Sequence, residues 1–126
     1  MSRVRPVFLD LRRIALPLPG LVSILHRVSG LLLVLALPSV AWLVERALSG
    51  PEGFAVVVVM LDAWPSRLLQ GVLLWSLLHH LLAGLRHLAL DLGWGLERVM
   101  ARRTAWLTLV TALVLLVGFL LVGGWR

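Results

Sequence analysis

Three polar side chains and a glycine recur along one face of the segment HHLLAGLRHLALDLG, residues 79–93. His80, Gly84, His87 and Asp91 follow at i, i+4, i+7 and i+11, which is one stripe of an α-helix. A neutral imidazole is a good ligand for haem iron, and a glycine one turn away removes a side chain that would block a flat macrocycle. The same spacing also fits a helix contact, in which His80 hydrogen-bonds to a neighbouring helix and Gly84 permits close packing. Spacing alone leaves both interpretations open.

Further basic side chains lie beside this stripe. If haem binds at His80, Arg86 and His87 are candidates for contact with its propionates, and Asp91 for orienting a basic neighbour. Ionisable residues inside a membrane usually face the interior of a helix bundle. We therefore expect this end of the helix to carry the chemistry of the chain.

A second group of polar residues opens the stretch LVSILHRVSGLLLVLAL, residues 21–37. Ser23 and Arg27 are one turn apart, and His26 lies about 100° round the helix. A hydroxyl and a guanidinium at the mouth of an apolar helix suit a carbonyl or phenol on a greasy ligand. The alternative is an arginine that reaches the lipid head groups and a serine bonded to its own backbone.

One chain is not expected to ligate both faces of a haem. The two axial nitrogens would lie about 4 Å apart across the iron, given bonds of about 2.0 Å. His79 and His80 point about 100° apart, and His80 and His87 lie about 10 Å apart on one helix. We expect His26 to be too close to the membrane surface to face His80. A six-coordinate haem would need a histidine from another chain, and five-coordinate haem or no haem remain as alternatives.

The composition indicates that lipid is the solvent around these residues. The chain has 126 residues, of which 60% are hydrophobic, and its mean hydropathy is +0.99. A soluble domain of this length cannot bury so much apolar surface. The absence of cysteine excludes disulfides and thiolate metal sites. The net charge of +6 reports orientation and head-group contact in a membrane chain, so we expect no nucleic-acid partner.

Hydropathy predicts three transmembrane helices and little else. We place them at about 21–46, 67–92 and 104–125, and treat residues 1–126 as a single membrane-anchor domain. The run FAVVVVML is too short to span a bilayer. We therefore predict a short interfacial segment at about 54–62. The expected fold class is all-α and integral to the membrane, with Pro38 tolerated inside the first helix.

The arginines predict the orientation. Nine of them lie on the side of the N-terminus and the second loop, and Arg46, Arg67 and Arg126 lie on the other. The positive-inside rule then places the N-terminus in the cytoplasm and the C-terminus in the periplasm.

The motifs RPVFLDL (5–11), SILHRVSG (23–30) and HLLAGLRHLALDLG (80–93), in this order, resemble the family of cytochrome b556 subunits of bacterial succinate dehydrogenase. GPEGF (50–54) is similar to the first loop of its proteobacterial members. The resemblance implies that three helices form half of a heterodimeric, haem-binding helical bundle. The sequence departs from the family at Leu90, where an aromatic residue or methionine is usual. We expect this departure to affect packing near the haem edge.

The resemblance also implies roles for individual residues. His80 matches the axial ligand of haem b, and Ser23 with Arg27 matches residues of the quinone site. His26, Arg27, Arg86 and His87 match the region of the haem propionates. His79 matches no functional position, and we expect it to face lipid or a partner.

By the same resemblance, the chain is one subunit of succinate:quinone oxidoreductase in the bacterial inner membrane. A flavoprotein subunit would oxidise succinate, an iron–sulfur subunit would pass the electrons on, and this chain would bind haem and quinone with a second small anchor that supplies the other axial histidine. Ser23 and Arg27 would polarise the quinone carbonyl. An anchor of a fumarate reductase and a haem-free membrane scaffold remain as alternatives.

Overall fold

The described part of the chain folds into four consecutive helices. The computed structural model describes residues 16–122, which form α1 (Leu18–Leu48), α2 (Pro51–Asp62), α3 (Trp64–Asp91) and α4 (Arg98–Leu121). No strand occurs within these residues. The termini beyond them, including the RPVFLDL motif and the arginines at 3, 5, 12, 13 and 126, lie outside the described part of the chain.

Prolines and glycines fix where the helices begin and end. α1, α2 and α3 each carry a proline in their first two positions, where the missing N–H costs no hydrogen bond. Gly50 separates α1 from α2 at a φ of 130°, a conformation that a side chain would disfavour. Because prolines start α1 and α3 ahead of the uncharged core, these helices begin three residues earlier than the predicted 21 and 67.

Three of the helices are long and apolar enough to cross a membrane: α1, α3 and α4. These helices pack little against one another. In the most apolar 18-residue stretch of each helix, only 11–17% is buried within the described chain. A bilayer satisfies such surfaces, and the backbone hydrogen bonds are met within each helix. The all-α integral membrane fold is therefore confirmed. α2 is helical and has 12 residues, about 18 Å at 1.5 Å per residue, which is too short to span.

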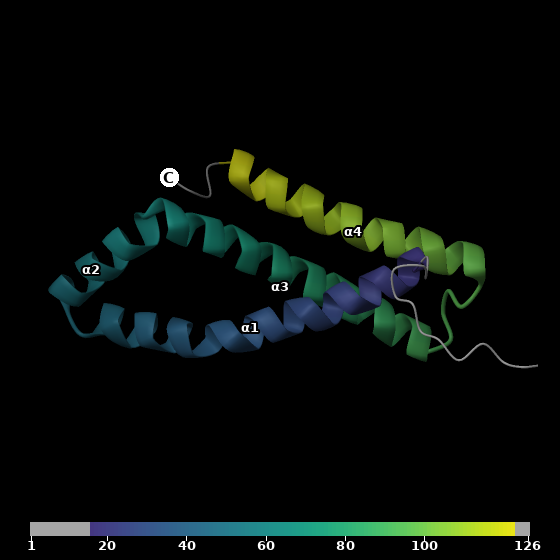
Figure 1. Ribbon diagram of the computed structural model, residues 1–126, viewed down its shortest axis with the longest axis horizontal. Helices are drawn as coiled ribbons and strands as arrows, with labels where there is room; N and C mark the ends of the chain where they lie inside the picture. Colours follow the sequence, from purple (N-terminus) through teal and green to yellow (C-terminus); the bar gives the residue numbers. More distant parts are fainter. Residues whose placement is uncertain (1–15, 123–126) are drawn as a thin grey trace, which may run out of the picture.

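α1 and α3 cross near the start of α1 and diverge toward the other end of the molecule, where α2 bridges them (Figure 1). α4 lies along α3, and Val22, Ala83 and Ala105 form the small core where α1, α3 and α4 meet. α1 continues through Pro38 without interruption. Gly53 lets α2 turn closely under the end of α1, because a Cβ at this position would collide with the Arg46 carbonyl.

Candidate functional site at the crossing of α1 and α3

α3 presents two different polar rows to its neighbours. One row is buried and consists of Ser76, His79, Ala83 and Arg86. The other row contains His80, Gly84 and His87, which are half-buried and lie against α1. Asp91, the last residue of the predicted stripe, is exposed at the end of α3. The helix period of about 3.6 residues separates the two rows, so that neighbouring residues enter different surroundings.

Three imidazole rings meet where α1 crosses the second row. The rings of His26 and His80 are stacked, with centroids 4.1 Å apart and an interplanar angle of 13°. The rings of His26 and His87 lie 5.0 Å apart at 38°. The expectation that His26 would be too shallow to face His80 is therefore wrong. α1 crosses α3 at His26, so the His26 and His80 rings lie at the same level along the two helices.

This stack still does not allow His26 and His80 to ligate one iron from opposite faces. Trans ligands must point their nitrogens at each other across about 4 Å, whereas two rings stacked face to face direct their nitrogens side by side. Within residues 16–122, no group of three or more histidines and acids has a geometry suited to a metal ion. The stacked His26 ring is therefore no candidate for a second ligand to a metal held at His80 Nε2.

Hydrogen bonds fix the orientation of the His80 ring. Its Nδ1 lies 3.0 Å from the His26 carbonyl oxygen and 3.3 Å from Ser29 Oγ. Since a carbonyl oxygen only accepts, Nδ1 carries a proton, and in the neutral ring this tautomer leaves the lone pair on Nε2. Metal-ligating histidines usually donate their second ring N–H to such an oxygen. His87 is held in the same way, with Nδ1 donating to the Ala83 carbonyl at 2.6 Å.

Two glycines make room for these rings. A Cβ on Gly84 would lie 3.4 Å from His26 Nε2, and a Cβ on Gly30 would lie 2.8 Å from His80 Cε1. The space above Gly84, which we predicted to accommodate a macrocycle, therefore borders the His26 ring. The sequence reasoning missed Gly30 and its neighbour Ser29. Their signal was a pair of small residues one turn after His26, which is typical of close helix contacts in membranes.

Arg86 lies in the buried row and bonds to α4. Its Nε donates to Thr104 Oγ1 at 3.1 Å and its guanidinium also donates to the Ala101 carbonyl at 3.1 Å. The side chain is 8% exposed. The structure does not bring Arg86 into the histidine cluster, although it follows His80 by only six residues. The reason is the helix period, which turns Arg86 toward α4.

His79 is fully buried within the chain. Its ring stacks on Trp75 with centroids 5.1 Å apart and an interplanar angle of 9°, and neither ring nitrogen has a hydrogen-bond partner among residues 16–122. The expectation that His79 would face lipid or a partner is wrong. It shares the face of α3 that packs against the rest of the molecule.

Ser23 and Arg27 lie one turn apart on α1, beside the histidine cluster. Ser23 is half-buried and Arg27 is exposed, so the guanidinium is open to a ligand, a partner or lipid head groups. Of the serines in this part of α1, Ser29 is the one whose hydroxyl donates to its own helix, at 2.9 Å from the His26 carbonyl.

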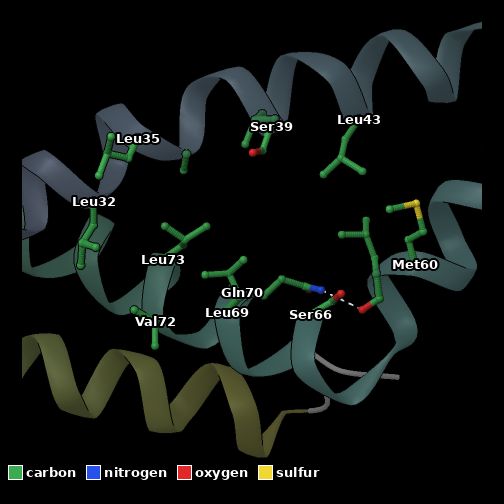
Figure 2. A pocket seen from close by; sticks show the side chains of 13 residues that line it. Leu32, Leu35, Ser39, Leu43, Met60, Ser66, Leu69, Gln70, Val72 and Leu73 are labelled. Atoms are coloured by element: carbon green, nitrogen blue, oxygen red, sulfur yellow. Dashed lines mark hydrogen bonds between the residues drawn. The ribbon is translucent and has the colours of Figure 1, made fainter.

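A cavity of about 420 Å³ lies at the other end of the α1–α3 pair, where the helices diverge. Figure 2 shows leucines from α1 and α3 around it, with Met60 of α2 closing one side. Its polar side chains are Ser39, Ser66 and Gln70, and the Gln70 amide donates to the Leu61 carbonyl at 2.8 Å. None of the predicted site residues lines this cavity, so we place the functional site at the histidine cluster.

Three apolar helices and this polar crossing define a membrane-anchor protein, and sequence comparison assigns its class. The chain belongs to the family of succinate dehydrogenase/fumarate reductase transmembrane subunits, whose model matches residues 1–119. It is therefore a membrane anchor of this class of enzyme complex.

Two individual relatives match over nearly the whole chain. A protein of Paracoccus denitrificans named succinate dehydrogenase cytochrome b556 subunit is 34% identical over 118 residues, which cover 94% of this chain and 91% of the relative. A protein of Coxiella burnetii with the same name is 35% identical over 127 residues, covering 99% and 98%. Both relatives are subunits of an enzyme complex by name.

Proposed function

We propose that this chain is the haem b-binding anchor of a succinate:quinone oxidoreductase. It binds the haem together with a second small anchor and forms part of the site at which quinone is reduced. The soluble partners are an iron–sulfur subunit and a flavoprotein subunit, and the membrane is the bacterial inner membrane. The haem, when bound, carries single electrons within the membrane.

The observation that carries this proposal is the hydrogen bonding of His80. The residue is half-buried in a membrane helix, its Nδ1–H is held by the His26 carbonyl, and its Nε2 is left for a metal. This donor set would fit haem iron, for which a neutral imidazole nitrogen is a good ligand. The stacked His26 ring would not supply a second ligand, so we propose that the second anchor provides a histidine.

Basic side chains near His80 would hold the propionates. His26 and His87 contact each other beside His80, and Arg27 follows His26 directly, so these three residues form the proposed propionate region. Arg86 was assigned to it by resemblance. To reach a propionate, Arg86 would have to give up its hydrogen bonds to Thr104 and Ala101; we therefore propose that it holds α4 instead.

Ser23 and Arg27 form the chain's part of the quinone site. The Ser23 hydroxyl and the Arg27 guanidinium donate hydrogen bonds to a quinone carbonyl, and the fixed positive charge stabilises negative charge that develops there as electrons arrive. Both residues lie within one turn of His26, which places quinone and haem at the same end of the helix bundle.

This end faces the cytoplasm in our proposal. Among the described residues, Arg27, Arg86 and three arginines at the start of α4 lie at the end where α3 meets α4, while Arg46 and Arg67 lie near α2. The excess of positive charge marks the cytoplasmic side. A cytoplasmic iron–sulfur subunit then meets the end that carries Ser23 and Arg27.

Purification of the native complex through a tag on this chain tests the proposal. We expect a flavoprotein, an iron–sulfur protein and a second small anchor to co-purify, and the dithionite-reduced minus oxidised spectrum to show the sharp α-band of bis-histidine haem b. A complex with these partners and no haem would support the scaffold alternative and contradict the proposal.

A further inference from the structure

α1 approaches the His80 ring unusually closely at Gly30. A Cβ at this position would lie 2.8 Å from His80 Cε1 and 3.2 Å from Nδ1. Real Cβ atoms do not come that close, so any other residue at position 30 would displace the ring. The glycine therefore provides the space in which His80 lies against α1.

The preceding residue completes the contact. Ser29 is fully buried, and its hydroxyl donates to the His26 carbonyl at 2.9 Å. The same carbonyl accepts the His80 Nδ1–H, and Ser29 Oγ lies 3.3 Å from that nitrogen. The His26 carbonyl oxygen, Ser29 Oγ and His80 Nδ1 thus form one small, partly buried hydrogen-bonded group between α1 and α3.

We propose that Ser29 and Gly30 are positioning residues for His80, which set the rotation of its ring and the tautomer that leaves Nε2 for iron. Gly30 fixes where the ring lies, and Ser29 holds the carbonyl that accepts Nδ1–H. The inference rests on the proposed function, in which His80 ligates haem. Neither residue touches the iron itself.

This arrangement has a measurable electronic consequence. A hydrogen bond from Nδ1–H to an oxygen raises the basicity of the ligating Nε2. A more basic imidazole stabilises ferric over ferrous iron. Because the Ser29 hydroxyl donates to the same His26 carbonyl that accepts Nδ1–H, removing this hydroxyl should shift the midpoint potential that the haem would have. Moving the ring should change the low-spin electron paramagnetic resonance (EPR) signal.

Gly30→Ala in the tagged native complex tests the volume requirement. We expect haem per complex to fall several-fold, and the haem that remains to show a shifted low-spin EPR signal. Gly118→Ala in α4 is the matched control, because no atom lies within 4 Å of a Cβ there.

Ser29→Ala tests the hydrogen-bonded group without adding volume. We expect full haem content, a midpoint potential shifted from that of the wild type and a shifted EPR signal. This variant also decides the question if Gly30→Ala fails to assemble. If Ser29→Ala gives the same midpoint potential and the same EPR signal as the control Gly118→Ala, the inference is overturned.

The outcomes also separate this inference from the proposed function. If the wild-type complex contains no haem, or if His80→Leu keeps an unchanged haem spectrum, the proposed function fails and His80 is not the ligand. If His80→Leu changes the spectrum while Gly30→Ala and Ser29→Ala leave content, potential and EPR signal as in the wild type, only the positioning role of Ser29 and Gly30 is refuted.

Discussion

At the scale of single residues, position on the helix decides what each histidine can do. His79 and His80 are adjacent, yet His79 is fully buried without a hydrogen-bond partner among residues 16–122. His80 has Nδ1 bonded to the His26 carbonyl. Because consecutive residues point about 100° apart, the His79 ring packs on Trp75 and the His80 ring lies against α1.

Ser23 and Arg27 give the first prediction. Arg27→Leu removes a charged donor, for which a loss of about 1.5–3 kcal/mol is usual, whereas Ser23→Ala removes a neutral one at about 0.5–1.5 kcal/mol. At about 1.4 kcal/mol per factor of ten, we expect succinate–quinone turnover to fall roughly 10- to 150-fold and roughly 2- to 10-fold, respectively. Arg27→Lys should recover only part of the activity because the planar fork is lost.

The control is succinate oxidation with an artificial acceptor that takes electrons from the soluble subunits, which should be unchanged in all three variants. Quinone kinetics as in the wild type in both Ser23→Ala and Arg27→Lys would show that these residues only seat α1 at the head groups.

The sequence predicted which polar residues share a helix face, but it did not predict the level at which residues of different helices meet. The helical stripe predicted that His80 and His87 share a face, and the structure places both against α1. The stack of His26 on His80 could not be predicted, because it depends on where two helices cross. Ser29 and Gly30 were missed for the same reason, since the pair of small residues that marks a close contact does not say which side chain of another helix it meets.

At the scale of elements, α3 is the helix that both neighbours share. Its row of His80, Gly84 and His87 packs against α1, and its row ending in Arg86 packs against α4. Arg86 donates two hydrogen bonds to α4. The Thr108 hydroxyl donates to the Thr104 carbonyl at 2.9 Å, within α4 itself. The polar link between α3 and α4 at this point is therefore Arg86.

The second prediction follows for Arg86. Arg86→Leu should lower the thermal midpoint of the purified complex, because charged hydrogen bonds contribute about 1.5–3 kcal/mol, and should leave the haem spectrum unchanged. Arg86→Lys should be intermediate, since an ammonium does not reproduce the two-point fork. Thermal denaturation and an absorption spectrum measure both effects.

Arg102→Leu, a change at an exposed arginine of α4, is the matched control and should have no effect on the midpoint. An Arg86→Leu complex with normal stability and a disturbed haem spectrum would instead place this guanidinium at a propionate.

The elements themselves were largely readable from hydropathy, since three long apolar runs became three long helices. The boundaries were less so. A helix can extend beyond the apolar segment that spans the lipid. Prolines in their first turn start α1 and α3 several residues before the apolar core. The sequence did not predict whether the segment at 54–62 is helical, because FAVVVVML has no amphipathic period. In the structure α2 begins at Pro51, and Gly53 allows it to pack closely against the end of α1.

At the scale of the whole molecule, the histidine cluster and the largely apolar cavity lie at opposite ends of the α1–α3 pair. α1 and α3 cross near the start of α1 and diverge toward α2 (Figure 1). The cluster includes His26, close to the start of α1, and the cavity is lined by later residues of α1 together with Met60 of α2. This polarity agrees with a chain that meets soluble electron donors at one membrane surface only.

The third prediction concerns orientation. A reporter enzyme fused after residue 126 should behave as periplasmic, and one inserted in the turn at 92–97 should behave as cytoplasmic, because the arginine excess lies on the side of that turn. Paired reporters active in opposite compartments are the measurement. The reverse pattern would put Ser23 and Arg27 on the wrong side for a cytoplasmic iron–sulfur partner.

The haem spectrum of a His80→Leu complex, measured beside His79→Leu, tests the central claim most directly. His79→Leu removes two buried ring nitrogens that have no partner among residues 16–122, so it should assemble and keep the wild-type α-band. His80→Leu should lose the haem or convert it to a different spin state with an altered band. An unchanged low-spin spectrum in His80→Leu, or its loss in His79→Leu alone, would contradict the assignment of His80 as the haem ligand.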